Sequence, residues 1–121
     1  MSEKSQVRVR RVYDDPDSDD GARVLVDRLW PRGVSKERAH LDEWCKTVAP
    51  STDLRKWYSH DPAKFDGFAE RYRTELETDD EQRAALDHLR ELAAAGPLTL
   101  LTATKQPEIS EAAVLRQVLT D

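Results

Sequence analysis

The residues with the clearest chemical potential follow a short hydrophobic run, Val24–Val26. An acidic residue, Asp27, comes first, and the arginines Arg28 and Arg32 follow it closely. A guanidinium group is the side chain best suited to two-pronged recognition of a phosphate or a carboxylate. In α/β folds, ligand sites lie where strands end. This segment therefore predicts a binding site for a small anion.

Other polar and aromatic side chains are predicted to join this site, because strand ends and the helix starts that follow them converge on one edge of an α/β sheet. We expect His60 to exchange a proton, since imidazole titrates near neutral pH, with Asp27 as the second candidate catalytic residue. The candidate ligand-binding residues are Arg28, Trp30, Arg32, Gly33, Ser51, Arg55, Trp57 and Lys105. The arginines would hold the charge, and the indoles would wall the pocket.

Two hypotheses about function follow from these residues. In the first, the domain binds, and in one version transforms, a small anionic or nucleotide-like ligand in this pocket. In the second, the same arginines and tryptophans form a surface for a protein partner, because Trp and Arg are frequent interface anchors. The sequence leaves open whether the chain is an enzyme, which ligand or reaction is involved, and the oligomeric state.

Composition excludes some classes of protein. The formal net charge is -5, which disfavours broad binding to nucleic acid or to an anionic membrane. No apolar run approaches the roughly 20 residues that span a bilayer. The lone cysteine, Cys45, forms no internal disulfide, so we expect a reducing, cytoplasmic location, with Cys45 buried as a small hydrophobic residue.

The familiar motifs for cofactors and metals are absent from the sequence. It contains no Gly-rich phosphate loop, no nucleophile elbow and no paired-histidine metal motif. The acidic stretch Asp14–Asp20 lacks the glycine and the closing glutamate of a calcium loop. We therefore predict neither a cofactor nor a metal site.

Hydrophobic periodicity and turn residues predict the elements that position the site. Strands are expected at Val7–Tyr13, Arg23–Leu29 and Leu98–Thr102, the last buried on both faces because it lacks polar alternation. Leu41–Ala49 fits a helical spacing, but Pro50 stops it, and we favour a strand for its second half. Helix starts are predicted at Ser35, at Ser51 or Thr52, at Asp61-Pro62, at Thr78 and at Ser110, with Gly96 ending a helix.

These elements predict a small α/β sandwich, with a mostly parallel sheet flanked by helices. A chain of 121 residues is close to the commonest domain size. We expect residues 1–6 to form a disordered tail and residues 7–121 to form one domain. The N-terminal sequence lacks the apolar core of a signal peptide.

Four short motifs together resemble the YeaO-like proteins, a family of small bacterial and archaeal proteins grouped as a domain of unknown function. They are Val-Asp-Arg-Leu-Trp-Pro-Arg-Gly at 26–33, Ala-Pro-Ser at 49–51, Leu-Arg-Lys-Trp at 54–57 and His-Asp-Pro at 60–62. The resemblance runs from about Val7 to Leu119. It implies a compact cytoplasmic α/β domain, and it attaches no catalytic role to the motif residues.

The sequence departs from the family pattern near its end. YeaO-like proteins tend to read Leu-Leu-Tyr-Ala-Ala-Lys-Asp, whereas this chain reads Leu-Leu-Thr-Ala-Thr-Lys-Gln at 100–106. An aromatic residue and an acid are thus replaced in the segment 102–111. Whether this chain keeps the ligand of its relatives is left open.

Overall fold

A computed structural model describes residues 6–120 of the chain. Within that range one sheet is formed by β1 (Val7–Arg11), β2 (Ala22–Leu25), β3 (Glu43–Trp44) and β4 (Leu98–Thr102), and the α-helices are α1 (Lys36–Ala39), α2 (Thr52–Tyr58), α3 (Phe65–Thr78), α4 (Asp80–Ala95) and α5 (Glu111–Thr120). Short 3-10 turns occupy Lys46–Val48, Pro62–Lys64 and Pro107–Ile109. The predicted disordered tail lies mostly outside the described residues.

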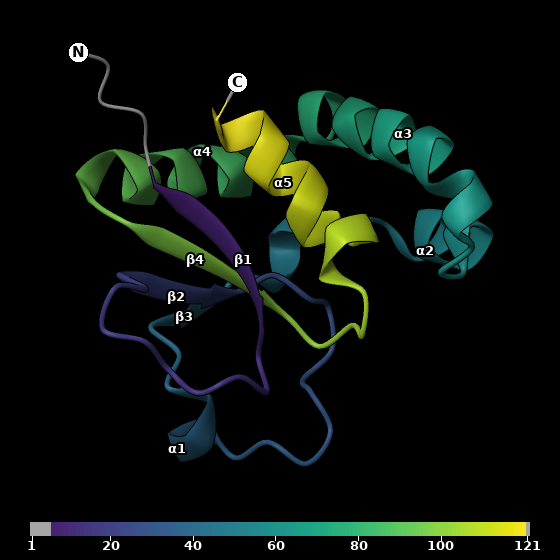
Figure 1. Ribbon diagram of the computed structural model, residues 1–121. Coiled ribbons are helices and arrows are strands. Elements are labelled where there is room, and N and C mark those ends of the chain that lie inside the picture. The colour runs from purple at the N-terminus through teal and green to yellow at the C-terminus, as the bar shows by residue number, and fades with distance from the viewer. Residues whose placement is uncertain (1–5, 121) are drawn as a thin grey trace.

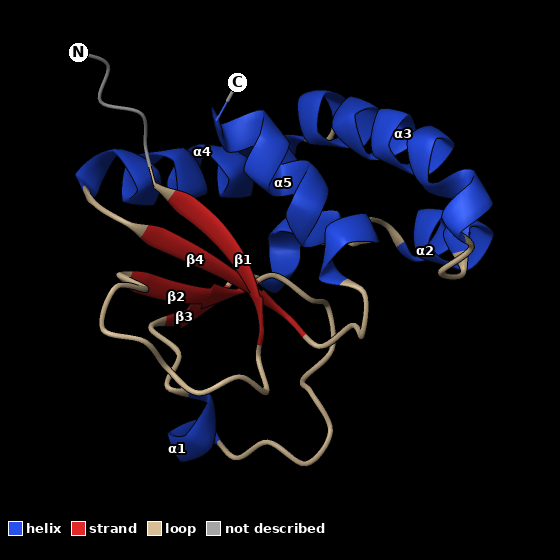
Figure 2. Cartoon of the chain, in the orientation of Figure 1, coloured by secondary structure: helices blue, strands red, loops and turns tan. Residues whose placement is uncertain are grey.

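The four strands described are all parallel and lie in the order β1-β4-β2-β3. Helices α3, α4 and α5 lie on one side of the sheet, and the short α1 lies on the other (Figures 1 and 2). The prediction of a small α/β domain is therefore confirmed. The sheet is more uniform than expected, because every pairing within it is parallel.

The central strand β4 is buried along its whole length, as its sequence predicts. Leu98 and Leu100 belong to the core under the helices, together with Phe68 and Tyr72 of α3. Leu101 faces the opposite side of the sheet. This second, smaller core contains residues of β2 and β4, the residue after β1 and residues of the connection between β2 and β3, namely Val12, Leu25, Val34, Ala39 and Leu101, with Trp30 and Trp44 packed against them.

Several predicted boundaries and caps are confirmed. Ser35 and Ser51 accept hydrogen bonds from the backbone N–H groups of Arg38 and Leu54, and Asp61 accepts one from Ala63. These are the contacts expected of N-cap side chains. Gly96 ends α4, and Cys45 is buried as expected.

Three local predictions are wrong. The strand expected at Arg23–Leu29 ends at Leu25, because Asp27 is held by hydrogen bonds at the end of β4. The second half of Leu41–Ala49 is a turn, since β2 stops at Leu25 and offers no further pairing. The cap of α4 is Asp79, which accepts from Gln82, whereas the Thr78 hydroxyl donates to a carbonyl within α3.

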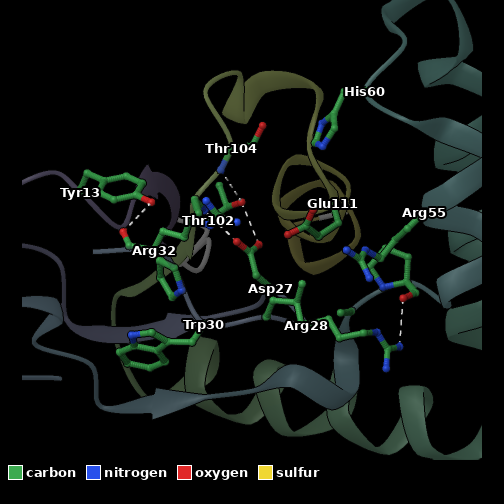
Figure 3. Close-up of a pocket in the computed structure, with 15 residues that line it drawn as sticks. Tyr13, Asp27, Arg28, Trp30, Arg32, Arg55, His60, Thr102, Thr104 and Glu111 are labelled. Atoms are coloured by element: carbon green, nitrogen blue, oxygen red, sulfur yellow. Dashed lines mark hydrogen bonds between the residues drawn. The ribbon is translucent and has the colours of Figure 1, made fainter. Parts of the chain in front are cut away.

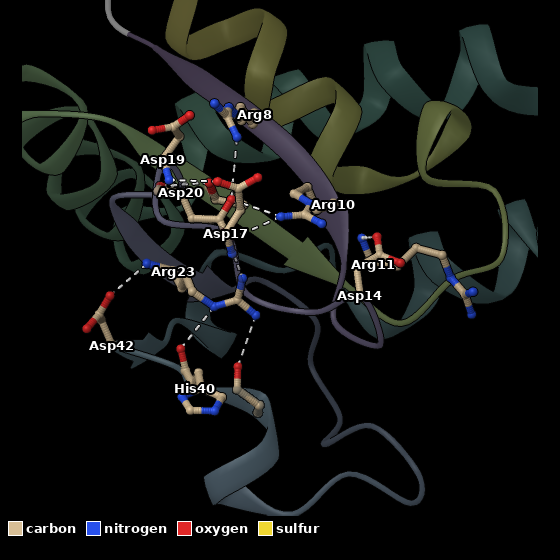
Figure 4. Close-up of polar contacts among 12 residues, drawn as sticks. Arg8, Arg10, Arg11, Asp14, Asp17, Asp19, Asp20, Arg23, His40 and Asp42 are labelled. Atoms are coloured by element: carbon tan, nitrogen blue, oxygen red, sulfur yellow. Dashed lines mark hydrogen bonds and ion pairs between the residues drawn. The ribbon is translucent and has the colours of Figure 1, made fainter.

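The loop at Asp14–Asp20 ends in a buried ion cluster, not in a cation site. Asp20 is 1% exposed and pairs with Arg8, Arg10 and Arg23 at 3.5, 3.1 and 2.5 Å (Figure 4). Burial alone would raise the pKa of Asp20, but hydrogen bonds from the Asp17 N–H and from two arginines outweigh burial and lower it. The cluster joins β1 to the entrance of β2.

Side chains and a loop protect the outer edge of β1. The carbonyl of Gln6 accepts from the Leu98 N–H, and the Val12 N–H donates to the carbonyl of Thr102. The backbone N–H and C=O groups of the even-numbered residues therefore point toward β4, and those of the odd-numbered residues point outward. Arg116 of α5 donates its Nε–H to the carbonyl of Val7. At the other end, Asp14 bonds both backbone groups of Arg11.

Candidate functional site

A pocket of about 360 Å³ lies beyond the carboxyl ends of β2 and β4. Its walls come from the segment after β2, the Ala49-Pro50 turn, α2 and the residue His60, the end of β4, and the start of α5. Figure 3 shows these side chains together. This is the edge of an open parallel sheet at which ligands bind in α/β folds.

Asp27 is the most firmly held residue of the pocket. One carboxylate oxygen accepts from the hydroxyl of Thr102 at 2.8 Å, and the other accepts from the backbone N–H of Ala103 at 2.8 Å. The Asp27 carbonyl also accepts from the indole of Trp44. Donors on both oxygens fix the position of this carboxylate.

Arg28 reaches from the same segment to the Ala49-Pro50 turn. Its Nη2 donates to the carbonyl of Pro50 at 3.1 Å, whereas its Nε–H is buried without a partner in the described part of the chain. A buried donor without an acceptor is costly, so it attracts an acceptor from a ligand or from water.

A polar network on α3 and α4 holds the turn that Arg28 contacts. Glu75 accepts from the backbone N–H and the hydroxyl of Ser51, and Gln82 donates to both Glu75 and the carbonyl of Ala49. Gln82 is itself buried. These hydrogen bonds from α3 and α4 hold the part of the pocket wall that Ala49 and Pro50 form.

Glu111, the first residue of α5, brings a second carboxyl group into the pocket. Its Oε2 atom is buried without a hydrogen-bond partner among the described residues. Figure 3 shows its carboxyl group facing that of Asp27. Burial first, and then the adjacent carboxylate of Asp27, raise the pKa of Glu111 well above its usual value, and Arg55 only partly opposes this.

Arg55 and His60 line the pocket from the opposite side. Both side chains are exposed, and the Arg55 guanidinium points toward Glu111 (Figure 3). The chain turns sharply between them, since Ser59 and His60 have left-handed backbone angles with φ of 47° and 57°. This turn ends α2 and places the His60 imidazole at the rim.

Trp30 and Arg32 also line the pocket. The Trp30 indole donates to the carbonyl of Val34 at 2.7 Å and packs edge-on against Trp44, with ring centroids 5.3 Å apart. Arg32 is exposed, and its carbonyl accepts from the hydroxyl of Tyr13. Trp30 therefore has a packing role in the second core as well as a place in the wall.

The structure does not bring the remaining candidates into this pocket. Gly33 adopts a left-handed turn at φ 73°, and Ser51 caps α2 while bonding Glu75. The ring of Trp57 lies between Lys64 and Arg71, 5.2 and 4.0 Å from their charged groups. Lys105 is exposed in the loop after β4. None of these four is among the residues that line the pocket.

Sequence reasoning missed Glu111 and Tyr13, which also line the pocket. An acidic residue in the first turn of a helix is common for electrostatic reasons, so Glu111 carried no distinguishing signal. Only the packing of α5 against the strand ends turns its carboxyl group toward Asp27.

Within residues 6–120, no group of three or more His, Cys, Asp and Glu side chains is placed to hold a metal ion. The same range contains no helix with the length and apolar character needed to cross a membrane.

Comparison with known proteins places the chain. The family model described as "Inactive DUF488-N3 subclade" matches residues 6–121. The chain belongs to this family. The YeaO-like resemblance is confirmed by "Uncharacterized protein YeaO" of Escherichia coli, which is 40% identical over 109 residues, covering 90% of this chain and 92% of that protein.

Two mycobacterial proteins are more similar to this chain than the Escherichia coli protein is. "Uncharacterized protein Rv3073c" of Mycobacterium tuberculosis and "Uncharacterized protein Mb3100c" of Mycobacterium bovis are each 50% identical over 119 residues, covering 98% of this chain and 98% of each protein. No solved structure gives a significant match.

Proposed function

We propose that this DUF488-N3 domain binds a small oxyanion in the pocket between β2, β4 and α5, and that it does so without transforming the ligand. The observation that carries the proposal is that Arg28 lines the pocket and that its buried Nε–H has no acceptor among the described residues. Phosphate, carboxylate and sulfate groups offer the planar or tetrahedral oxygens that a guanidinium recognises best.

The charge of the pocket supports the same class of ligand. Arg28, Arg32 and Arg55 line it, against the carboxyl groups of Asp27 and Glu111. Burial raises the pKa of Glu111 well above its usual value, which weakens the negative charge opposed to these arginines. A local excess of positive charge attracts anions even though the whole chain carries a net charge of -5.

Binding without chemistry fits two observations. Both oxygens of Asp27 already accept hydrogen bonds from the protein, so this carboxylate acts as an anchor for the end of β4. The description of the matching family as inactive supports the same conclusion. The proposal includes the reducing, cytoplasmic location expected from the single cysteine, Cys45.

Calorimetric titration with sulfate, inorganic phosphate and a nucleoside monophosphate tests the proposal. Arg55→Ala is the informative variant, because this exposed side chain points into the pocket. Loss of a charge-assisted hydrogen bond is expected to weaken binding about tenfold or more. Lys56→Ala is the matched control, since it removes the same charge from the neighbouring exposed position, outside the walls of this pocket.

Two results would contradict the proposal: wild-type protein that binds none of the three anions at millimolar concentration, or binding that Arg55→Ala and Lys56→Ala weaken equally. The second result would show a general charge effect in place of a specific contact.

One observation favours a second candidate function, a surface for a protein partner. Leu29 is 66% exposed and Tyr13 is 37% exposed, and both lie at the pocket. Exposed apolar side chains beside arginines are typical of interface anchors. Light scattering of wild-type protein and of Leu29→Ser tests this function. It requires that wild-type protein associates, that Leu29→Ser does not, and that added anions leave the association unchanged.

A further inference from the structure

The two carboxyl groups of the pocket differ in how the protein satisfies them. Asp27 accepts one hydrogen bond on each oxygen, from Thr102 and from Ala103. Glu111 presents a buried Oε2 atom with no partner in the described range, facing Asp27. Donors stabilise an ionised carboxylate, and burial without donors favours a neutral acid. The absence of a donor at Oε2 thus distinguishes the carboxyl group of Glu111 from that of Asp27.

The groups around Glu111 come from several elements and act in both directions. The groups that face it are Asp27 and Arg28 after β2, Arg55, Tyr58 and His60 from α2 and its end, and Tyr72 from α3. Asp27 and burial favour the protonated acid, whereas Arg55 favours the ionised form. The arginine lies within the pocket, where a bound anion would compete for it.

We infer that Glu111 enters the anion pocket as a neutral acid whose proton is shared with Asp27, and that the pocket accepts an oxyanion only while this proton is held. The inference rests on the proposed function and adds its regulation. A protonated Glu111 leaves Arg55 available to the ligand. An ionised Glu111 pairs with Arg55 and places a second negative charge beside the anion, so the ligand is released as pH rises.

The experiment uses sulfate as the probe, because its charge is the same from weakly acidic to alkaline pH and its own protonation adds nothing to the profile. Calorimetric titrations of wild-type protein are compared with Glu111→Gln, which has the shape of the neutral acid and no proton to lose. The control is Glu108→Gln, which removes the same charge from a nearby exposed residue outside the pocket.

For wild-type protein and Glu108→Gln, the affinity for sulfate is expected to fall by up to about tenfold per pH unit above the midpoint at which Glu111 ionises. Glu111→Gln is expected to bind at alkaline pH as tightly as wild-type protein binds at acidic pH. Wild-type and Glu111→Gln profiles that run parallel would overturn the inference while leaving the anion site in place.

A second measurement needs no variant and no ligand. Carbon-13 NMR of the side-chain carboxyl groups reports the ionisation of Glu111 directly. A midpoint well above that of Glu108 supports the shared proton, and a midpoint equal to it overturns the inference. Absence of sulfate binding by wild-type protein and by Glu111→Gln at every pH would instead overturn the proposed function, together with the release of ligand derived from it.

Discussion

Asp27 and Thr102 are joined by a hydrogen bond of 2.8 Å between positions 75 residues apart in the chain. The Ala103 N–H adds a second bond to the same carboxylate. Together they tie the exit of β2 to the exit of β4 and direct the following segment, which carries Arg28, across the end of the sheet. Asp27 thus ends β2 and also lines the pocket.

Replacing Thr102 by valine is expected to destabilise the domain by about 2 kcal/mol, because it removes a donor from a charged acceptor while keeping the shape of the side chain. Urea unfolding followed by tryptophan fluorescence measures this change. Thr78→Val is the control, since its hydroxyl donates to a carbonyl on the exposed side of α3. Equal losses for the two variants would show that the Asp27 anchor contributes nothing particular.

The stability of the domain is expected to depend on the ionisation of Glu111 at pH values above the usual pKa of a glutamate. Its pKa is raised in the folded state, mainly by burial, so the folded protein binds the proton more tightly than the unfolded chain. Stability is therefore fully present below the pKa of the unfolded chain and is lost as pH rises through the folded pKa.

Thermal unfolding across this pH range checks the sign of the effect. Wild-type protein should lose stability relative to Glu111→Gln as the solution becomes more alkaline. A difference between the two proteins that stays constant with pH would contradict the raised pKa.

The sequence predicted the elements whose signals are local. Ser35, Ser51 and Asp61 cap helices through contacts with residues two or three positions away, and β4 shows its burial in its own composition. The edge of the sheet at which the site lies was also predictable, since it follows from parallel topology.

What the sequence could not reveal depends on contacts between distant segments. The early end of β2 results from the bonds of Asp27 to the exit of β4. Likewise, Trp57 and Arg55 lie two positions apart on one short helix, yet only Arg55 faces the pocket. Helical geometry separates such neighbours, and the packing of α2 against α3 decides which of them points inward.

The buried ion cluster predicts a loss of stability in acid. Asp20→Asn is expected to cost about 3 kcal/mol at neutral pH, because it leaves the buried guanidinium of Arg23 without its counter-ion. Hydrogen bonds hold the pKa of Asp20 below its usual value of 3.8, so this stability is present above that value and is lost as pH falls through the lower folded pKa.

Urea unfolding of Asp20→Asn and wild-type protein from neutral to strongly acidic pH tests this prediction, and the difference between them should shrink only in acid. Asp19→Asn is the control, since its side chain is exposed in the same loop. A comparable cost for this control would mean that loop conformation, and not the ion cluster, accounts for the effect.

Two glycines with left-handed backbone angles are expected to respond differently to alanine. A Cβ atom at Gly21 would lie 2.1 Å from the carbonyl oxygen of Pro97, whereas one at Gly33 would meet nothing within 4 Å. Gly33→Ala should therefore cost only about 1 kcal/mol of backbone strain, and Gly21→Ala on the order of 3 kcal/mol, because the overlap adds to the strain. Chemical denaturation of both variants measures the contrast, and similar values would contradict the close approach of Gly21 to Pro97.

The contacts that cover the outer edge of β1 limit the pairing of this strand with strands of other protein chains. With the carbonyl of Val7 occupied by Arg116 and both backbone groups of Arg11 occupied by Asp14, the outward-facing residue left between them is Val9. A foreign strand needs a longer row of vacant amides and carbonyls to add itself to a sheet. The domain is thereby guarded against growth into fibrils or strand-swapped pairs along this border.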